Sequence, residues 1–277
     1  MVHCAVDMKG VQYRYPDGYI ALDDIDFQVG LHERAVILGA NGAGKSTLLS
    51  VMSGILEPTK GSIKILHTEL TQKTVRNLRA SMGLVFQEPD NQLFMPTLYE
   101  DVAFGPLNMG LSAEEVRERV KEALDIVGLS SLGDKPPHHL SVGEKKRAAI
   151  ATVLAMRPKI LILDEPTAHL DPKGRIEFID FLAQLHSEGD LTLITATHDV
   201  DSVPLLADRA YILNQGRLIR AGTVVDAFSD TETLRKANLM PPTVTQLFQQ
   251  VHNFTKQKGK GPLPMTLPEA VRAFCQL

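Results

Sequence analysis

A glycine-rich segment has the residue types and the spacing of a phosphate-binding loop. Residues 39–47 read GANGAGKST and fit the pattern G-x-x-x-x-G-K-[ST], with Lys45 and Ser46 in the last two places. Glycines let consecutive backbone N–H groups curve around a phosphate, and the start of a following helix adds favourable partial charge. Lys45 would then hold the β- and γ-phosphates of ATP, while the Ser46 hydroxyl would bind Mg²⁺. The candidate nucleotide-binding residues are Gly39, Ala40, Asn41, Gly42, Ala43, Gly44, Lys45, Ser46 and Thr47.

Two adjacent carboxylates, Asp164 and Glu165, follow an apolar run in the segment ILILDEPTAHLD at residues 160–171. Carboxylates at the end of a buried strand are costly unless a cation or a proton compensates their charge. We expect Asp164 to hold the water shell of Mg²⁺ and Glu165 to polarise the attacking water as a general base. Taken alone, the pair also fits a solvated turn; together with the phosphate loop it indicates a catalytic site.

A third motif, LSVGEKKR at residues 140–147, opens a predicted helix that runs to about residue 156. Ser141 and Gly143 lie in its first turn, where free N–H groups and the helix dipole favour an anion. Taken by itself, this motif is equally compatible with an ordinary helix N-cap. Its meaning therefore depends on the motifs around it.

The elements that must position these residues are read from the apolar pattern. Short runs rich in Ile, Leu or Val alternate with helical patterns, which indicates an α/β fold with a largely parallel sheet. The phosphate loop directly follows one run, and the acidic pair ends another. The predicted strands are residues 35–38, 63–66, 82–86, 160–163, 191–195 and 210–213.

From about residue 89 to residue 156 the strand signals stop. Within this stretch, residues 112–128 predict a helix that begins with a capping box of Ser112 and Glu115 and ends at Gly128. We therefore expect a helical subdomain at about 89–156, inserted between two halves of the sheet domain. The apolar positions on one face of the predicted helix are Val116, Val120, Leu124 and Val127.

The character of the sequence changes again after about residue 237. Pro241 and Pro242 precede an amphipathic pattern that includes Phe248, and a second one that includes Phe274 follows the polar linker KQKGKGP. We expect a main domain over residues 1–238 and a small helical extension over residues 239–277. The apolar positions around the two phenylalanines could hold two copies of the chain together or be buried within one chain.

Composition excludes several classes of function. A net charge of -4 argues against a nucleic-acid binder whose affinity depends on a basic surface. The longest apolar run, between Arg147 and Arg157, is about half of the ~20 residues that a membrane-spanning helix needs. The two cysteines show no metal or redox spacing, and the first residues do not have the pattern of a secretory signal. We expect a cytosolic chain that binds no nucleic acid.

The three motifs, in this order, resemble those of ABC transporter ATP-binding subunits across residues 1 to about 238. The ABC signature is at residues 140–143, between the Walker A loop at 39–47 and the Walker B strand that ends in Asp164. Because the signature distinguishes this family from other P-loop enzymes, the resemblance is specific. It implies a P-loop NTPase (RecA-like) sheet core and ATP hydrolysis that powers a transporter.

The resemblance implies roles for further residues. Tyr15 matches the aromatic residue that stacks on adenine, with Tyr13 as the competing choice; either could instead pack in the core. Gln87 matches the Q-loop glutamine, which senses Mg²⁺ and the attacking water and faces the transport partner. His198 matches the switch histidine, which contacts the γ-phosphate. The implied Mg²⁺ ligands are Ser46, Gln87 and Asp164.

The resemblance also implies that two chains share each active site. Ser141 and Gly143 would act in trans, covering the γ-phosphate bound to a second ATPase subunit. Asp171 matches the D-loop aspartate. His169 departs from the family pattern, which commonly has a small residue there, and its effect on communication between sites is left open.

A finer resemblance concerns residues 86–111, FQEPDNQLFMPTLYEDVAFGPLNMGL, and the tail residues 263–271, LPMTLPEAV. Both are similar to the ATPases of energy-coupling-factor importers, especially the cobalt and nickel group; Gln92 and the EDVAFGP run are typical there. The resemblance implies a dimer of two ATPase chains, a homodimer or else a heterodimer, on the cytoplasmic face of the cell membrane, with a membrane coupling protein and a membrane substrate-binding protein as partners. Importers of vitamins in the same group are the alternative.

Two other classes of protein fit the sequence less well. ABC proteins that act on ribosomes carry two cassettes, and those of DNA repair carry long coiled coils, whereas this chain has one Walker A loop and no coiled-coil pattern. A regulatory subunit that binds ATP without turnover is disfavoured because Lys45, Glu165 and His198 are all intact.

Overall fold

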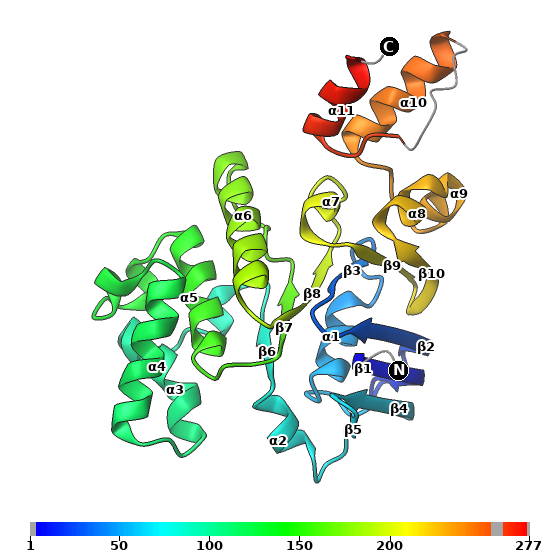
Figure 1. The fold of residues 1–277 in the computed structure, drawn as a ribbon. Coiled ribbons are helices and arrows are strands. Elements are labelled where there is room, and N and C mark those ends of the chain that lie inside the picture. Colours follow the sequence, from blue (N-terminus) through cyan, green and yellow to red (C-terminus); the bar gives the residue numbers. More distant parts are fainter. Residues whose placement is uncertain (1–3, 256–262, 276–277) are drawn as a thin grey trace.

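The computed structural model describes residues 4–255 and 263–275, and for residues 252–255 it describes the backbone alone. Helix α1 (Lys45–Met52) lies between two sheets, and its buried face packs with side chains of both (Figure 1). The polar linker expected at residues 256–262 falls outside the described residues. Across the described residues, no helix combines the length and the apolarity that crossing a membrane requires.

The larger sheet has the strand order β10-β9-β3-β8-β7-β6. All neighbouring strands are parallel except β10, which is antiparallel to β9. Five of its six strands were predicted, with bounds that differ from the prediction by two residues at most; β10 was not predicted. Its strands are β3 (Arg34–Leu38), β6 (Met82–Val85), β7 (Ile160–Asp164), β8 (Thr192–Thr197), β9 (Arg209–Asn214) and β10 (Arg217–Thr223).

The larger sheet confirms the expected largely parallel sheet, whereas the second sheet is antiparallel and was not predicted. The predicted strand at 63–66 belongs to it, not to the parallel sheet. The long strands β1 and β2 were missed because only one face of each is buried: Ile25 and Phe27 are buried while Asp26 and Gln28 between and after them are exposed. Its strands are β1 (Cys4–Arg14), β2 (Ile20–Gly30), β4 (Lys60–Ile65) and β5 (Thr68–Glu69).

Between β6 and β7 the structure contains helices and no strand, as expected for this stretch. The predicted capping box forms: the backbone N–H of Glu115 donates to the Ser112 hydroxyl, and Ser112 N–H donates to the Glu115 carboxylate at 2.9 Å. Val116, Val120, Leu124 and Val127 are all buried, as predicted. The elements are η1 (Pro89–Asn91), α3 (Leu98–Asn108), α4 (Ala113–Ile126), η2 (Ser130–Leu132), η3 (Pro137–His139) and α5 (Val142–Leu154).

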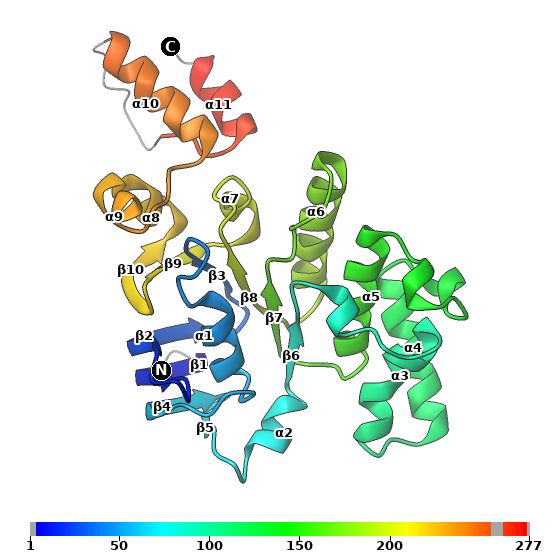
Figure 2. The same cartoon turned by 180° about the vertical axis from the view of Figure 1, so that it is seen from behind.

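These helices lie beyond the β6 edge of the larger sheet, on the opposite side from the antiparallel sheet (Figures 1 and 2). Helix α5 packs on both α3 and α4 and also against β6, where Gly83 allows the close approach of Val153. The start of α5 therefore has a fixed position relative to the strand ends.

The remaining helices connect or follow the strands of the larger sheet. Helix α2 precedes β6, α6 and α7 flank β8, and α8 and α9 follow β10. Their bounds are α2 (Val75–Arg79), α6 (Pro172–Glu188), α7 (Val203–Leu206), α8 (Val224–Ser229) and α9 (Thr231–Lys236).

The tail forms two helices, α10 (Thr243–Thr255) and α11 (Leu267–Phe274), beyond α8 and α9 (Figure 2). Phe248 is only 2% exposed, and its ring lies 5.0 Å from the ring of Phe274. The apolar position around Phe248 is therefore buried within one chain. The division of the chain at residue 238 remains a prediction.

Candidate active site

The Walker A loop connects β3 to α1, as predicted from the sequence. Its backbone requires glycine at two positions. Gly44, the N-cap of α1, has φ of 104°, and a Cβ atom there would lie 2.9 Å from the carbonyl oxygen of Ala21. A Cβ atom on Gly39 would lie 2.6 Å from the carbonyl oxygen of Leu213. The conformation of the loop is thus fixed by its glycines and by the strands beside it.

Lys45 is the first residue of α1, and its ammonium group is buried. It donates hydrogen bonds to the carbonyl oxygens of Gly39 at 2.8 Å and Ala40 at 3.3 Å. It also lies 3.2 Å from the carboxylate of Glu165, so the Walker A and Walker B motifs form a buried ion pair. The structure therefore brings these two sequence-predicted residues into direct contact.

Asp164 is the last residue of β7, and it is buried beside Ser46. Burial raises the pKa of the Asp164 carboxyl, while a hydrogen bond with Ser46 and the charge of Lys45 act in the opposite direction. Its Oδ1 atom is buried and has no hydrogen-bond partner in the described residues. A buried carboxylate oxygen without a partner, next to a hydroxyl group, is chemically suited to a hard cation such as Mg²⁺.

Glu165 directly follows β7 in a left-handed conformation, with φ of 45°. The residue is 4% exposed, and its carboxylate has several partners. Thr197 Oγ1 donates to Oε2 at 2.9 Å, and His198 Nδ1 lies 2.8 Å from Oε1. Because β8 lies between β3 and β7, the ends of these three strands bring Lys45, Glu165 and His198 together.

The aromatic residues near the Walker A loop have different environments. The Tyr15 hydroxyl is hydrogen-bonded to Thr47 Oγ1 at 3.1 Å, at the end of the nucleotide-binding loop. Tyr13 is buried in the core, with its ring edge-on to Tyr15 at 4.9 Å. Tyr19, which sequence analysis missed, stacks on Tyr15 at 6.4 Å and is exposed. Tyr15 is thus placed at the loop, and Tyr13 has the core-packing role.

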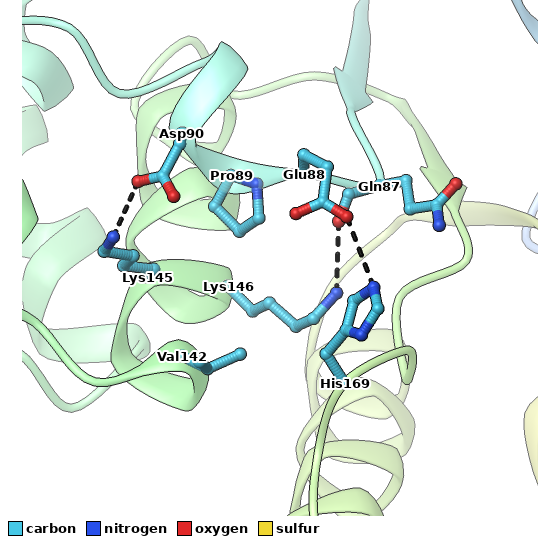
Figure 3. Close-up of a pocket in the computed structure, with 8 residues that line it drawn as sticks. All are labelled: Gln87, Glu88, Pro89, Asp90, Val142, Lys145, Lys146 and His169. Atoms are coloured by element: carbon cyan, nitrogen blue, oxygen red, sulfur yellow. Dashed lines mark hydrogen bonds and ion pairs between the residues drawn. The ribbon is translucent and has the colours of Figure 1, made fainter.

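A cavity of about 250 Å³ lies where the Q-loop, the start of α5 and the D-loop meet (Figure 3). Three polar contacts cross it or lie at its edge: Lys145 with Asp90 at 2.7 Å, Lys146 with the Gln87 carbonyl oxygen at 3.3 Å, and His169 with Glu88 at 3.3 Å. The lining residues are Gln87, Glu88, Pro89, Asp90, Val142, Lys145, Lys146 and His169.

The Gln87 side chain points away from Lys146 (Figure 3). Among the described residues, no hydrogen bond joins its amide to Ser46 or Asp164, so the structure does not bring the three predicted Mg²⁺ ligands together. Ser46 and Asp164 are in contact. The role of Gln87 at the metal remains a prediction.

Ser141 and Asp171 both act as helix N-caps in this structure. The Ser141 hydroxyl accepts from Glu144 N–H, and Ser141 N–H donates to the Glu144 carboxylate at 2.7 Å. Asp171 accepts from Gly174 N–H at 2.7 Å and begins α6. Gly143 is the second residue of α5 and lies in its first turn. Within one chain, therefore, the ordinary capping role of Ser141 is the one present.

Two residues at this site were missed by sequence analysis. Thr197 is fully buried and donates to Glu165; its position directly before His198 at the end of β8 was the available signal. Lys146 is buried on α5, on the same face as Ala149, Ile150 and Val153. The helical spacing of three, four and seven residues from these apolar positions would have predicted that Lys146 points inward.

Gln92 had been singled out only by resemblance, and the structure shows what it contacts. Its Nε2 donates to the Ala149 carbonyl oxygen at 2.9 Å and to Thr152 Oγ1 at 2.8 Å. Its Oε1 accepts from Phe86 N–H at 3.2 Å. Gln92 thereby connects the segment after β6 to the middle of α5.

Comparisons with known proteins agree with this geometry. The family model described as ABC transporter matches residues 22–168. The energy-coupling factor transporter ATP-binding protein EcfA of Methanocaldococcus jannaschii is 50% identical over 246 residues, which is 88% of each chain.

Solved structures show the same fold. The cbiO1 structure of Clostridium perfringens, described as part of the ABC transporter complex cbiONQ, has a TM-score of 0.77 and 42% identity and covers 92% of this chain and 100% of its own. A dimeric ATP-binding cassette in a post-hydrolysis state, bound to ADP and Pi, has a TM-score of 0.71 and 29% identity and covers 79% of this chain and 98% of its own. The chain belongs to the ABC transporter family and is an ATP-binding, ATP-hydrolysing member of it.

Proposed function

We propose that this chain is the ATPase of an energy-coupling-factor importer for cobalt or nickel ions. Hydrolysis is supported above all by one observation, the buried Glu165 carboxylate held beside the Walker A loop by Lys45, Thr197 and His198. The type of importer is supported by the EcfA name of similar chains and by the resemblance of residues 86–111 to such ATPases. Metal specificity then belongs to a separate membrane protein.

ATP binds with its phosphates on the Walker A loop and its adenine against Tyr15. Lys45 already donates to two carbonyl oxygens of the loop, and phosphate oxygens are stronger acceptors for an ammonium group. The β- and γ-phosphates therefore replace these weaker partners. Stacking on the Tyr15 ring positions the base. The Tyr15 hydroxyl does not select the base by a hydrogen bond, because it is already bonded to Thr47.

Ser46 and Asp164 are the residues that would hold Mg²⁺, with Gln87 as a third ligand once its side chain turns inward. The partnerless Oδ1 of Asp164 supports this fit. Mg²⁺ supplies neutralisation of the negative charge on the phosphates. Ser46 and Asp164 orient the nucleotide, since both lie at fixed positions on α1 and β7.

Glu165 accepts a proton from the attacking water, and its neighbours prepare it for that step. Thr197 and His198 each bond one carboxylate oxygen, which fixes the orientation of the general base. His198 bonds Glu165 through Nδ1, so its other ring nitrogen, Nε2, is the one available to the γ-phosphate. Negative charge that develops on the γ-phosphate is thus stabilised by Lys45 and His198 of the same chain.

A second copy of the chain completes each site. Ser141 and Gly143 lie at the exposed start of α5, and the Walker A loop of one chain leaves the far side of the γ-phosphate open to water. In the dimer this helix start covers that side in trans, and Asp171 in the D-loop contacts the neighbouring site. Closure of the dimer on ATP and its reopening after hydrolysis drive the membrane partners.

The membrane coupling protein docks on the segment Gln87 to Phe94 and the neighbouring α3, so that the chain lies peripherally on the cytoplasmic face of the membrane. Phe94 is 61% exposed and Phe104 is 42% exposed, and their rings pack edge-to-face at 5.1 Å. An exposed aromatic pair of this kind is typical of a protein interface. Leu107, one turn further along α3, extends the apolar surface.

The test is co-purification of the tagged chain from native membranes, followed by identification of the bound proteins. The proposal expects a coupling protein and a substrate-binding protein; a vitamin-binding partner would overturn the metal assignment, and no membrane partner would overturn the importer. Phe94→Ala should reduce the yield of the complex while the isolated chain keeps its ATPase rate. Ile55→Ala, which removes an exposed apolar side chain elsewhere, should leave the yield unchanged. An unchanged yield with Phe94→Ala would contradict the docking surface.

A further inference from the structure

Lys146 is a buried lysine that none of the roles above explains. It is 3% exposed, on the face of α5 that packs inward. Removing an ammonium group from water is costly unless polar partners replace the water. Burial accordingly lowers the pKa of Lys146. Within the described residues Lys146 makes no ion pair at contact distance, so the ammonium group depends on other partners.

Its partners are two backbone carbonyl oxygens of the active site. Lys146 Nζ donates to the carbonyl oxygen of Gln87 at 3.3 Å (Figure 3). It also donates to the carbonyl oxygen of Glu165 at 3.4 Å. Both bonds are long, but the site is buried, and the low local dielectric there strengthens the attraction between the ammonium group and the carbonyl dipoles. Gln87 and Glu165 follow β6 and β7, which are paired in parallel, so one ammonium group spans two adjacent strand ends.

The contact with Glu165 falls on a strained part of the backbone. Glu165 has φ of 45°, a left-handed conformation that a residue with a side chain rarely adopts. Such a conformation persists only when its surroundings hold it in place. Lys146 holds the carbonyl oxygen of Glu165, while Thr197 and His198 hold its carboxylate. The backbone and the side chain of the proposed general base are therefore held by different partners.

We propose that Lys146 is a positioning residue for ATP hydrolysis, whose ammonium group holds the carbonyl oxygens of Gln87 and Glu165 and so couples helix α5 to the general base of its own chain. The inference rests on the proposed role of Glu165. Helix α5 begins at the signature that covers the partner's nucleotide, and Lys146 is one turn further along it. Helix α5 thereby connects the signature, which contacts the nucleotide of the partner chain, to Glu165 of its own chain.

A purely structural role for Lys146 is disfavoured because other contacts already hold α5 in place. Gln92 bonds the middle of the helix at Ala149 and Thr152. Lys145 pairs with Asp90 at 2.7 Å on the rim of the same cavity but contacts neither active-site carbonyl. Lys145 is therefore a matched control, one residue away on the same helix.

The experiment uses the full chain and compares Lys146→Met, Lys146→Gln, Lys146→Arg and Lys145→Met. Steady-state kinetics give kcat and KM, and calorimetry without Mg²⁺ gives the Kd of ATP. Lys146→Met keeps the length of the side chain without its charge, and kcat should fall about ten-fold or more. The Kd of ATP should stay within about two-fold of wild type, because Lys146 touches no nucleotide-binding residue of the Walker A loop. Lys146→Arg, which keeps the charge, should recover most of kcat, and Lys145→Met should resemble wild type.

Several results would overturn the inference. A wild-type kcat in Lys146→Met would do so, as would an equal loss in Lys145→Met or no recovery in Lys146→Arg. If both neutral variants lost ATP binding and turnover together, the role of Lys146 would be structural only. Glu165→Gln separates this inference from the proposed function: if that variant retains turnover, the role of Glu165 itself is wrong. If it loses turnover while Lys146→Met does not, only the Lys146 inference fails.

Discussion

At the scale of single residues, the account depends most on Glu165. Its carboxylate is buried with the ammonium group of Lys45 at 3.2 Å, and either charge alone at this depth would be costly. The contact between the two groups therefore offsets part of that cost. Thr197 and His198 then fix which way the carboxylate points. In the proposed mechanism this carboxylate accepts a proton from water, which a neutral amide in its place could not do.

The corresponding prediction is that Glu165→Gln loses turnover and keeps ATP binding. An amide cannot accept the proton, so the hydrolysis rate should fall by about 10²- to 10⁴-fold. The closed dimer should also persist longer, because it waits for hydrolysis to reopen. Phosphate release measures the first effect and gel filtration with ATP measures the second. Glu122→Gln, which changes an exposed carboxylate paired with Arg157, is the control and should turn over normally. A wild-type rate in Glu165→Gln would remove Glu165 from the mechanism.

At the scale of elements, the start of α3 illustrates how the fold presents the proposed docking surface. Asp101 is buried in the first turn of α3, and its Oδ1 accepts from the backbone N–H groups of Phe94 and Met95, both at 3.0 Å. These bonds fix the loop that carries Phe94. The second carboxylate oxygen, Oδ2, is buried and has no hydrogen-bond partner among the described residues. The loop is therefore held at the cost of burying a charge.

This cost predicts how stability changes with pH. Burial raises the pKa of Asp101 above its ordinary value of 3.8, although the two backbone hydrogen bonds act against it. The penalty is absent when the carboxyl is protonated and appears as the pH rises through the raised pKa. Asp101→Asn carries no such charge. The stability of Asp101→Asn relative to wild type, measured as the difference in the free energy of unfolding, should thus be greater at pH 7 than at about pH 4.

Denaturant unfolding of both proteins at the two pH values checks this prediction. Asp23→Asn is a control of opposite sign, because hydrogen bonds from Gln12 and Arg217 lower the pKa of Asp23. Its relative stability should be less favourable at pH 7 than at low pH. A difference between Asp101→Asn and wild type that does not depend on pH would show that the Asp101 carboxyl is not penalised in the fold.

The elements also show what the sequence could predict and what it could not. Strand β7 is buried on both faces, so its residues form the continuous apolar run that was recognised, and the capping box at Ser112 is a local signal. Strand β2 is buried on one face only, and its polar residues concealed it from a search for apolar runs. Local patterns predict elements well when burial is uniform along them.

The candidate site divides in the same way. The Walker residues were found because their spacing is local, within a single loop or strand end. The contacts between Glu165 and Thr197, or between Lys146 and Gln87, join residues far apart in the chain and depend on strand order. No local pattern contains that order, so the partners of Thr197 and Lys146 could not be predicted, although helical spacing does give the inward direction of Lys146. The side-chain direction of Gln87, an exposed residue, is likewise known only from the structure.

At the scale of the whole molecule, the parts of the proposed mechanism lie in separate places. The Walker A loop and the general base are at the ends of the parallel strands, whereas the start of α5 lies in the helical insert beyond β6 (Figure 1). Ser141 and Val142 are exposed there and are not directed at the Walker A loop by any hydrogen bond within the described chain. This arrangement fits a site that two chains share, which is the central claim of the proposed mechanism.

The most direct test of that claim is ATP hydrolysis by mixed dimers of two inactive variants, Lys45→Ala and Ser141→Arg. Differently tagged proteins are mixed, and dimers that carry both tags are isolated and assayed beside each variant alone. If the signature acts in trans, a mixed dimer has one site with both lesions and one site with neither. Activity should then return to about half of the wild-type rate per dimer, provided that the two sites act independently. Mixed dimers that form, bind ATP and remain inactive would contradict an active site completed by the partner's signature helix alone.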